Sequence, residues 1–474
     1  MKDKRNLILK DKNIMKGLIL LSFPVMMSNI LKSIHDLVDI YFIGNQALPK
    51  ELLAYQVSSI TLTSPIIQIA GAIATGLMIA GTSIMSKQIG ENNSTKARRV
   101  STELYILSFL LGVLVNAILY FGSSLFLKWM HILPENPIFM YAWQYLKYRS
   151  FECPFLFLFY AYIATKHASG DTITPVILNC ISIVFNIILT WYLIQKQNRM
   201  VEGAALATVL ANIIIIPLCL IPFSKKETTI KLEWKQLSLS RPIVKELFQK
   251  GFPASFSIMM TSFAFIIINR MITHFDASVI YAIGVVNRLN ALLLLPTLSI
   301  GSVLTTFIGQ NYGAKQYERM KKILVNAMLL TILITILLSI SLFFTKDYLI
   351  RIFIQKDVDA KTFDLAKLFF TYLILGFVFM GCFEVWNGYF QGMGRTDVCL
   401  LLSIARLWIL RLPILHIMMY KMSLGILSIY YSMLLSNGIT CLLGIIFYPF
   451  TKTKQIKTKQ QNVLRGGLKW QKTM

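Results

Sequence analysis

Long apolar runs separated by short polar segments dominate the chain. A bilayer core of about 30 Å is crossed by roughly 20 apolar residues in a helix. The fourth run is the weakest, because Pro154 interrupts it, and we expect Glu152 within it to lie at the membrane interface. The pattern predicts an all-α integral membrane protein with twelve transmembrane helices, at residues 17–43, 54–80, 100–127, 144–165, 174–195, 203–222, 251–275, 279–308, 323–345, 368–391, 398–420 and 424–449.

Short motifs recur in the same order in the two halves of the chain. They are Phe23-Pro24 and Phe252-Pro253, Ile89–Asn92 and Ile308–Asn311, and the glycine turns that begin at Gly170 and Gly394. Six spans per half give both halves the same orientation, as in a parallel repeat about the membrane normal. We therefore predict two pseudo-symmetric six-helix lobes: an N-terminal lobe at 1–222, a basic cytoplasmic linker at 223–250, a C-terminal lobe at 251–450 and a basic cytoplasmic tail at 451–474.

Composition supports the membrane assignment and explains the net charge of +25. Hydrophobic residues make up 55% of the chain and charged residues 15%, with a mean hydropathy of +0.62, whereas soluble domains carry about 25% charged residues. Of the 47 Lys and Arg residues, 30 fall on the side of the N-terminus, 13 on the other side and 4 within spans. This bias predicts a multi-pass protein of the cytoplasmic (inner) membrane with both termini in the cytoplasm. Because the charge follows the topology, we expect no nucleic-acid partner.

The sequence lacks the usual signatures of a metal centre, a disulfide framework or an enzyme. The six cysteines fall in apolar runs without paired spacing. No GxxxxGK[ST] motif is present, and the glycines at 392–394 lack the context of a dinucleotide site. We therefore expect no enzyme activity and no cofactor, and an ion gradient of H⁺ or Na⁺ as the driving force.

The first span carries four ionisable side chains on one face. At 100° per residue, Lys32, His35, Asp36 and Asp39 fall within roughly 100° of arc. Charge in the hydrocarbon costs about 2.5–3.5 kcal/mol on insertion scales, which makes these residues functional candidates. Burial favours the neutral form of a carboxyl group, and a nearby cation favours its charged form. A carboxyl group that is subject to both effects can exchange a proton for a cation. The alternative is a structural i,i+4 pair of Lys32 with Asp36.

Glu384 is the only acid deep within a span of the second half, and Asn387 follows at helical spacing. We interpret Glu384 and Asn387 as a second candidate substrate or cation site. Alternatively, Glu384 is the structural partner of an arginine, because arginine pairs well in buried sites. The candidates within spans are Arg288, Arg406 and Arg411, and Arg288 is also a candidate substrate or cation contact.

Several segments together resemble the multidrug and toxic compound extrusion (MATE) family. They are Asp39–Gly44, which fits Asp-x-x-Phe-x-Gly, then Gly81–Ser83 with Gly90–Asn92 and Lys96–Arg99, then Gly170–Pro175 with Asn186, and Gly203–Thr208. The resemblance covers almost the whole chain. It implies two six-helix lobes around a V-shaped cavity, and export of cationic, often aromatic, drugs in exchange for protons or sodium.

The resemblance also implies site residues. The family's N-lobe cation site, a possible Na⁺ site, maps onto Asp39, Asn186 and Thr208, and an acid found in the family is replaced by Thr190. Taken alone, Asn186, Thr190 and Thr208 would be interpreted as hydrogen bonds between helices. In the C-terminal half, the arginines of the eleventh span would oppose a cation, which leaves a zwitterionic or anionic substrate open.

The resulting hypothesis is a secondary active multidrug efflux antiporter that exports mostly cationic organic compounds in exchange for H⁺ or Na⁺ by alternating access. Its partners are then small drug-like compounds and the lipid bilayer, with no obligate protein partner. One alternative is a lipid-linked oligosaccharide or lipid flippase of the same superfamily, which should have a strongly cationic cavity. A membrane-embedded enzyme is less favoured, because the sequence shows no catalytic dyad or metal cluster.

Overall fold

The computed structural model describes a chain built from helices. It covers residues 2–44, 49–224, 238–353 and 360–470, and within them it leaves out the side chains of 2–4, 35–37, 39–40, 44, 50, 221–224, 277, 353 and 450–470. The helices, of which η1 to η3 are π-helical, are α1 (Lys2–Leu9), α2 (Ile14–Gly44), α3 (Lys50–Gly90), α4 (Ser94–Trp129), α5 (Pro137–Ser150), α6 (Cys153–Ala168), α7 (Ile173–Trp191), η1 (Tyr192–Lys196), α8 (Val201–Ser224), α9 (Arg241–Ile272), α10 (Ala277–Leu293), α11 (Leu295–Gly313), α12 (Tyr317–Phe353), α13 (Ala360–Gly392), α14 (Thr396–Ile404), η2 (Ala405–Arg411), α15 (Leu412–His416), η3 (Ile417–Lys421) and α16 (Leu427–Trp470).

Eleven helical stretches among the described residues are long and apolar enough to cross a membrane. They match the predicted spans except the fourth, 144–165, which consists of α5 and α6. These helices meet just before Pro154, whose ring has no N–H to continue the helical hydrogen bonds. The eighth span is likewise divided, between α10 and α11, next to Pro296. The prediction of twelve transmembrane helices is confirmed, with two of them interrupted at prolines.

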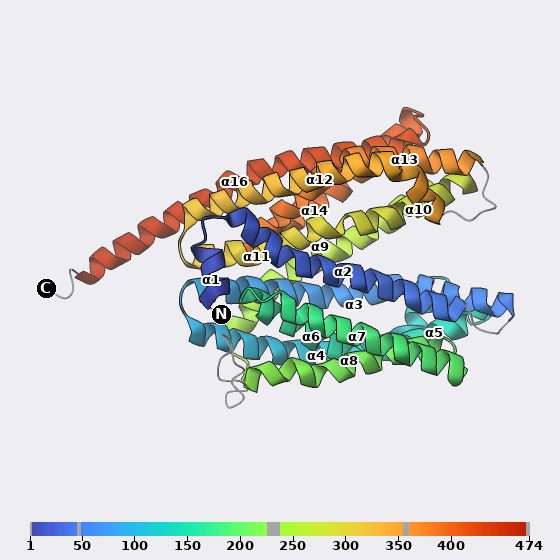
Figure 1. Cartoon of the computed structure of the whole chain (residues 1–474), viewed down its shortest axis with the longest axis horizontal. Helices are drawn as coiled ribbons and strands as arrows, with labels where there is room; N and C mark the ends of the chain where they lie inside the picture. The colour runs from blue at the N-terminus through green and yellow to red at the C-terminus, as the bar shows by residue number, and fades with distance from the viewer. Residues whose placement is uncertain (1, 45–48, 225–237, 354–359, 471–474) are drawn as a thin grey trace.

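The backbone repeats between the two halves as the motifs predict. Left-handed residues occur at Asn92 and Lys315, at Gly170 and Gly394, and at Asn198 and Ser423, with spacings of 223 to 225 residues. Each pair ends equivalent helices. The chain therefore consists of two copies of one arrangement, which form the two lobes in Figure 1.

Two long helices connect the lobes by changing partners along their length. The first half of α2 contributes Leu18 and Leu21 to a core with α11, α12 and α13, whereas its last turn packs Ile43 against η1 and α8. The first half of α9 places Leu247 in the core of the N-terminal lobe, whereas its end places Ile268 in a core of the C-terminal lobe. The predicted boundaries 1–222 and 251–450 remain a prediction, and most of the predicted linker, residues 225–237, lies outside the described residues.

The lobes touch through glycines near the N-terminus of the molecule. A Cβ on Gly90 of α3 would overlap the carbonyl oxygen of Gln310 in α11, and one on Gly313 would overlap the carbonyl oxygen of Lys87. Further along α3, a Cβ on Gly76 would lie 2.6 Å from the carbonyl oxygen of Gly251 in α9. Because these glycines have no side chain, the backbones approach directly and hold the lobes together at this end (Figure 1).

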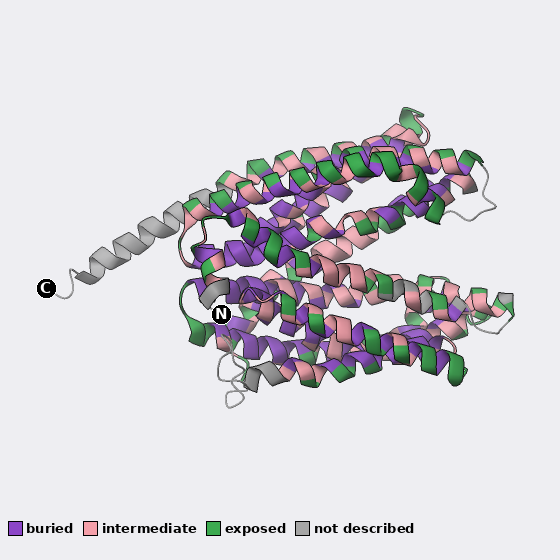
Figure 2. Ribbon diagram, viewed as in Figure 1, coloured by how far each residue is buried: buried purple, intermediate pink, exposed green. Residues whose placement is uncertain are grey.

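Outward-facing surfaces are apolar, as expected for contact with lipid. Phe121 of α4 is 83% exposed and Phe344 of α12 is 80% exposed. Exposed positions lie along the outer sides of both lobes in Figure 2. An exposed apolar belt of this kind marks a membrane-contacting surface.

The break between α5 and α6 contains a buried ion pair. Arg149 Nη1 lies 2.7 Å from Glu152 Oε2, and Asn212 of α8 donates to Glu152 Oε1 at 2.8 Å. Glu152 is buried inside the lobe, and its position at the membrane interface remains a prediction. The interruption of the helix at Phe151 and Glu152 turns the carboxylate toward α8 inside the lobe.

We predict that Gly90→Ala destabilises the protein while Gly71→Ala on the same helix does not. A new methyl group at Gly90 meets backbone, which cannot move aside, and overpacking of this kind costs about 1–3 kcal/mol. A Cβ on Gly71 meets nothing within 4 Å. Thermal unfolding in detergent measures both variants, and equal unfolding temperatures would contradict the proposed backbone contact.

We also predict that Glu152→Leu lowers the free energy of unfolding by about 3–5 kcal/mol, because it leaves the Arg149 guanidinium buried without its carboxylate. The double variant Arg149→Met/Glu152→Leu should regain most of this loss, because both charges are gone. The free energies of unfolding of the wild type, both single variants and the double variant form a double-mutant cycle. Additive losses would show that the two side chains act independently.

Candidate functional site

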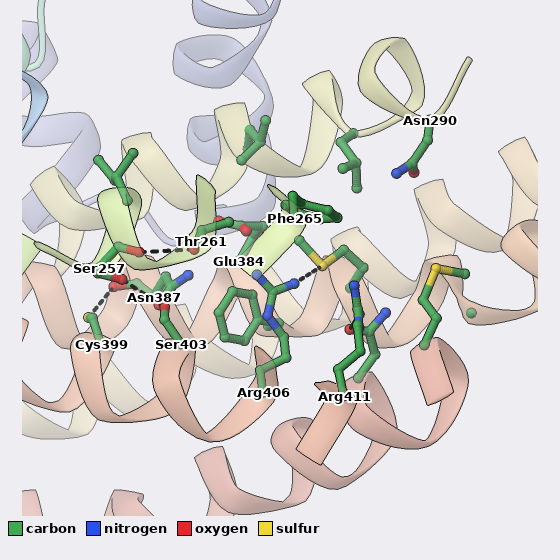
Figure 3. Close-up of a pocket in the computed structure, with 18 of the residues that line it drawn as sticks. Ser257, Thr261, Phe265, Asn290, Glu384, Asn387, Cys399, Ser403, Arg406 and Arg411 are labelled. Carbon is green, nitrogen blue, oxygen red and sulfur yellow. Dashed lines mark hydrogen bonds between the residues drawn. The ribbon is translucent and has the colours of Figure 1, made fainter. Parts of the chain in front are cut away.

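A cavity of about 400 Å³ lies in the C-terminal lobe. Its lining comes from α9, α10, α11, α13, α14, η2 and α16, with Ile79 of α3 added from the other lobe. Figure 3 shows Ser257, Thr261 and Phe265 on one side and Glu384 and Asn387 facing them. The walls are mostly apolar and aromatic with a few charged and amide groups, the usual composition of a site for small organic molecules.

Close packing of α13 on α11 fixes the position of Glu384. A Cβ on Gly301 of α11 would lie 2.7 Å from the Glu384 carbonyl oxygen, and one on Gly388 would lie 2.9 Å from the Gly301 carbonyl carbon. Asn387, one turn further along α13, lines the cavity beside Glu384. Glu384 and Asn387 therefore lie on the same face of α13 and line the cavity, which brings these two predicted residues together.

Arg406 and Arg411 reach the same cavity from η2. Arg406 is 4% exposed; its Nη1 donates to the Met380 sulfur at 2.9 Å, and its guanidinium carbon lies 4.1 Å from the centre of the Phe383 ring. Arg411 is 6% exposed and donates to Ser436 Oγ at 3.0 Å and Asn437 Oδ1 at 2.7 Å. Neutral side chains thus provide the hydrogen bonds of both buried cations.

Of the three arginines considered as partners of Glu384, Arg406 is its neighbour (Figure 3). The opposite charges of Glu384 and Arg406 attract each other, although the hydrogen bond of Arg406 goes to Met380. Arg288 of α10 is exposed and does not belong to the cavity lining. Its role as a substrate contact remains a prediction.

Three predicted residues of the N-terminal lobe lie together between α7 and α8. Asn186 donates to Thr208 Oγ1 at 3.1 Å, and the Thr190 hydroxyl donates to Asn186 Oδ1 at 3.4 Å. All three are buried. Amide and hydroxyl oxygens are hard ligands of the kind that Na⁺ accepts, and a cation held there would need a carboxylate to balance its charge.

The carboxylates predicted for that role, Asp36 and Asp39, lie outside the described side chains, as does His35. Lys32 of the same helix is exposed, and its Nζ lies 3.5 Å from the hydroxyl of Tyr160. The role of these four residues remains a prediction.

Sequence reasoning did not single out some of the side chains that complete the C-terminal cavity. The Ser257 hydroxyl donates to Ser403 Oγ at 2.8 Å, which joins α9 to α14. Ser436 and Asn437 of α16 hold Arg411. An adjacent serine and asparagine in an apolar span is a usable signal of a buried polar partner.

Comparisons with known proteins agree with this architecture. The MatE family model matches residues 24–192 and again 253–417, once in each half. The multidrug export protein MepA of Staphylococcus saprophyticus is 26% identical over 471 residues, which cover 98% of this chain and 100% of that protein.

Solved structures share the fold at low sequence identity. An outward-facing multidrug resistance MATE family transporter of the MOP superfamily superimposes with a TM-score of 0.87 at 20% identity, covering 95% of this chain and 98% of the other. A MOP superfamily transporter from Pyrococcus furiosus, whose binding pocket is described as having reverse polarity, superimposes with a TM-score of 0.84 at 20% identity, covering 94% and 96% of the two chains. With the family model matching most of both halves, the chain belongs to the MatE family of membrane transporters and is not an enzyme.

Proposed function

We propose that the chain is a secondary active exporter of amphiphilic organic compounds that exchanges its substrate for H⁺ or Na⁺. The cavity of the C-terminal lobe carries this proposal, because its apolar and aromatic walls surround a small set of charged groups. Relatives that match the chain end to end are named multidrug export proteins. The absence of an ATP-binding motif from the sequence favours an ion gradient as the energy source.

The coupling ion is proposed to bind in the N-terminal lobe, at Asp39 with the oxygens of Asn186 and Thr208. The hydrogen bond from Asn186 to Thr208, in a buried position between α7 and α8, supports this assignment. Substrate and ion would then occupy different lobes and would be exchanged by alternating access.

Orientation is part of the proposal. The sequence bias of Lys and Arg favours a cytoplasmic-membrane protein whose two termini are cytoplasmic. The glycine contacts between α3 and α11 then close the cytoplasmic end of the two lobes.

We predict that Asp39→Asn reduces gradient-driven export at least tenfold, because an amide cannot bind and release the coupling cation. The assay is export from proteoliposomes of a cationic dye, ethidium, and of an anionic fluorophore, dansylglycine, under an imposed pH or Na⁺ gradient without ATP. The matched control is Asp276→Asn, which removes an exposed carboxylate that pairs with Lys361 at 3.5 Å. The gradient that drives export identifies the coupling ion.

Export that is equally fast in Asp39→Asn would contradict coupling at this residue. If the folded protein exports neither fluorophore under either gradient, the exporter proposal fails and the lipid flippase takes its place. Movement of a fluorescent lipid between the leaflets of the same vesicles tests that alternative directly.

A further inference from the structure

The arginines of η2 point to the charge of the substrate. Arg406 and Arg411 are five residues apart, which on an α-helix would separate their directions by about 140°. In the π-helical turn the backbone hydrogen bonds join residues five apart, as from Leu412 N to Leu407 O. Residues five apart therefore lie above one another, and both guanidinium groups face the cavity (Figure 3).

The positive charge at the cavity exceeds the negative charge. Glu384 is the only acidic residue among the described residues that line it, against the two arginines. An arginine does not lose its proton in a protein. The lining therefore carries a net charge of +1 when Glu384 is ionised, and +2 when it is neutral.

Arg406 has hydrogen-bonding capacity to spare. Its Nη1 donates to a thioether sulfur, which is a weak acceptor. Its Nε is buried and has no hydrogen-bond partner in the described part of the chain. Arg411, by contrast, donates to both Ser436 and Asn437. It therefore acts as a fixed positive charge beside the Arg406 guanidinium, which is available to a ligand.

The body of a ligand would meet apolar surface next to these charges. Phe265 of α9, Leu298 of α11, Phe377 of α13 and Met433 of α16 are part of the cavity lining. A volume of about 400 Å³ accommodates a small aromatic molecule. A cation in this place would face two guanidinium groups, whereas a monoanion would neutralise the excess charge.

We propose that the cavity of the C-terminal lobe binds amphiphilic organic monoanions, with a carboxylate or sulfonate at Arg406 and an aromatic body against the apolar wall. Glu384 competes with the bound acid for Arg406 and so sets its affinity. This inference rests on the proposed export function, because it names the substrate class of the same site.

The proposal is tested by equilibrium binding, which does not depend on transport. The probes share one fluorescent body and differ in charge: dansylglycine is an anion, dansylamide is neutral and dansylcholine is a cation. Fluorescence titration uses the full-length protein in nanodiscs of phosphatidylcholine at fixed ionic strength. Wild type should bind dansylglycine about tenfold more tightly than dansylamide and should bind dansylcholine most weakly.

Two substitutions should change the affinity for dansylglycine in opposite directions. Arg406→Gln should abolish the preference over dansylamide, because the acid group loses its hydrogen-bond donors. Glu384→Gln should strengthen binding of dansylglycine severalfold, because it removes the competing carboxylate. Arg270→Gln, which neutralises an exposed arginine on α9 outside the cavity lining, should leave all three affinities unchanged.

A preference for dansylcholine that is lost in Glu384→Gln would overturn the proposal and assign the cavity to cations. Equal affinity for the three probes would overturn it as well. Because Glu384→Gln is expected to gain affinity, misfolding of Arg406→Gln cannot imitate the full pattern. Loss of dansylglycine binding when phosphatidylglycerol is added would overturn the proposal and assign the arginines to a lipid headgroup. Binding of dansylglycine without gradient-driven export would support this inference while the exporter proposal fails.

Discussion

The backbone contact between α3 and α11 is the constraint on which the rest of the structure depends. At Gly90 and Gly313 each helix lies directly against the backbone of the other, which no larger residue would permit. This contact holds the two lobes together near the N-terminus, and in Figure 1 their ribbons lie further apart toward the opposite end. Glycine is required here for close approach and not for a left-handed conformation, because neither Gly90 nor Gly313 has a positive φ.

A repeated backbone carries different chemistry in each lobe. The left-handed turns recur at spacings of 223 to 225 residues, and η1 and η3 end equivalent helices. In contrast, η2 occupies a place where its counterpart in the N-terminal lobe, within α7, is α-helical. The lobe with η2 holds two buried guanidinium groups, whereas α7 holds neutral amides and hydroxyls. The change in helical hydrogen bonding thus accompanies the change from uncharged to charged side chains.

Sequence patterns predicted the spans and the repeat, because each depends on local periodicity or on short motifs, whereas the family resemblance implied that Asn186 and Thr208 share a site. They did not predict that Arg406 and Arg411 face the same way, since 100° per residue places them on different sides of an α-helix. They also did not predict the partners of Glu152, because the helix break that turns it inward depends on packing against α8 and its Asn212. Long-range partners of this kind leave no periodic signal in the chain.

The crossing of α2 between the lobes offers a physical connection between the proposed ion site and the proposed substrate site. The same helix that bears Asp39 packs its first half in the C-terminal lobe, and Asn29 near its middle donates to Ser299 of α11 at 3.3 Å. In the proposed mechanism, a cation at Asp39 changes the charge near the end of a helix whose first half packs against α11 and α12. Since α11 packs directly on α13 at Glu384, a shift of α2 that displaces α11 would change the packing that positions the only acid in the described lining of the cavity. Coupling by this route requires an intact helix rather than a continuous polar path between the two sites.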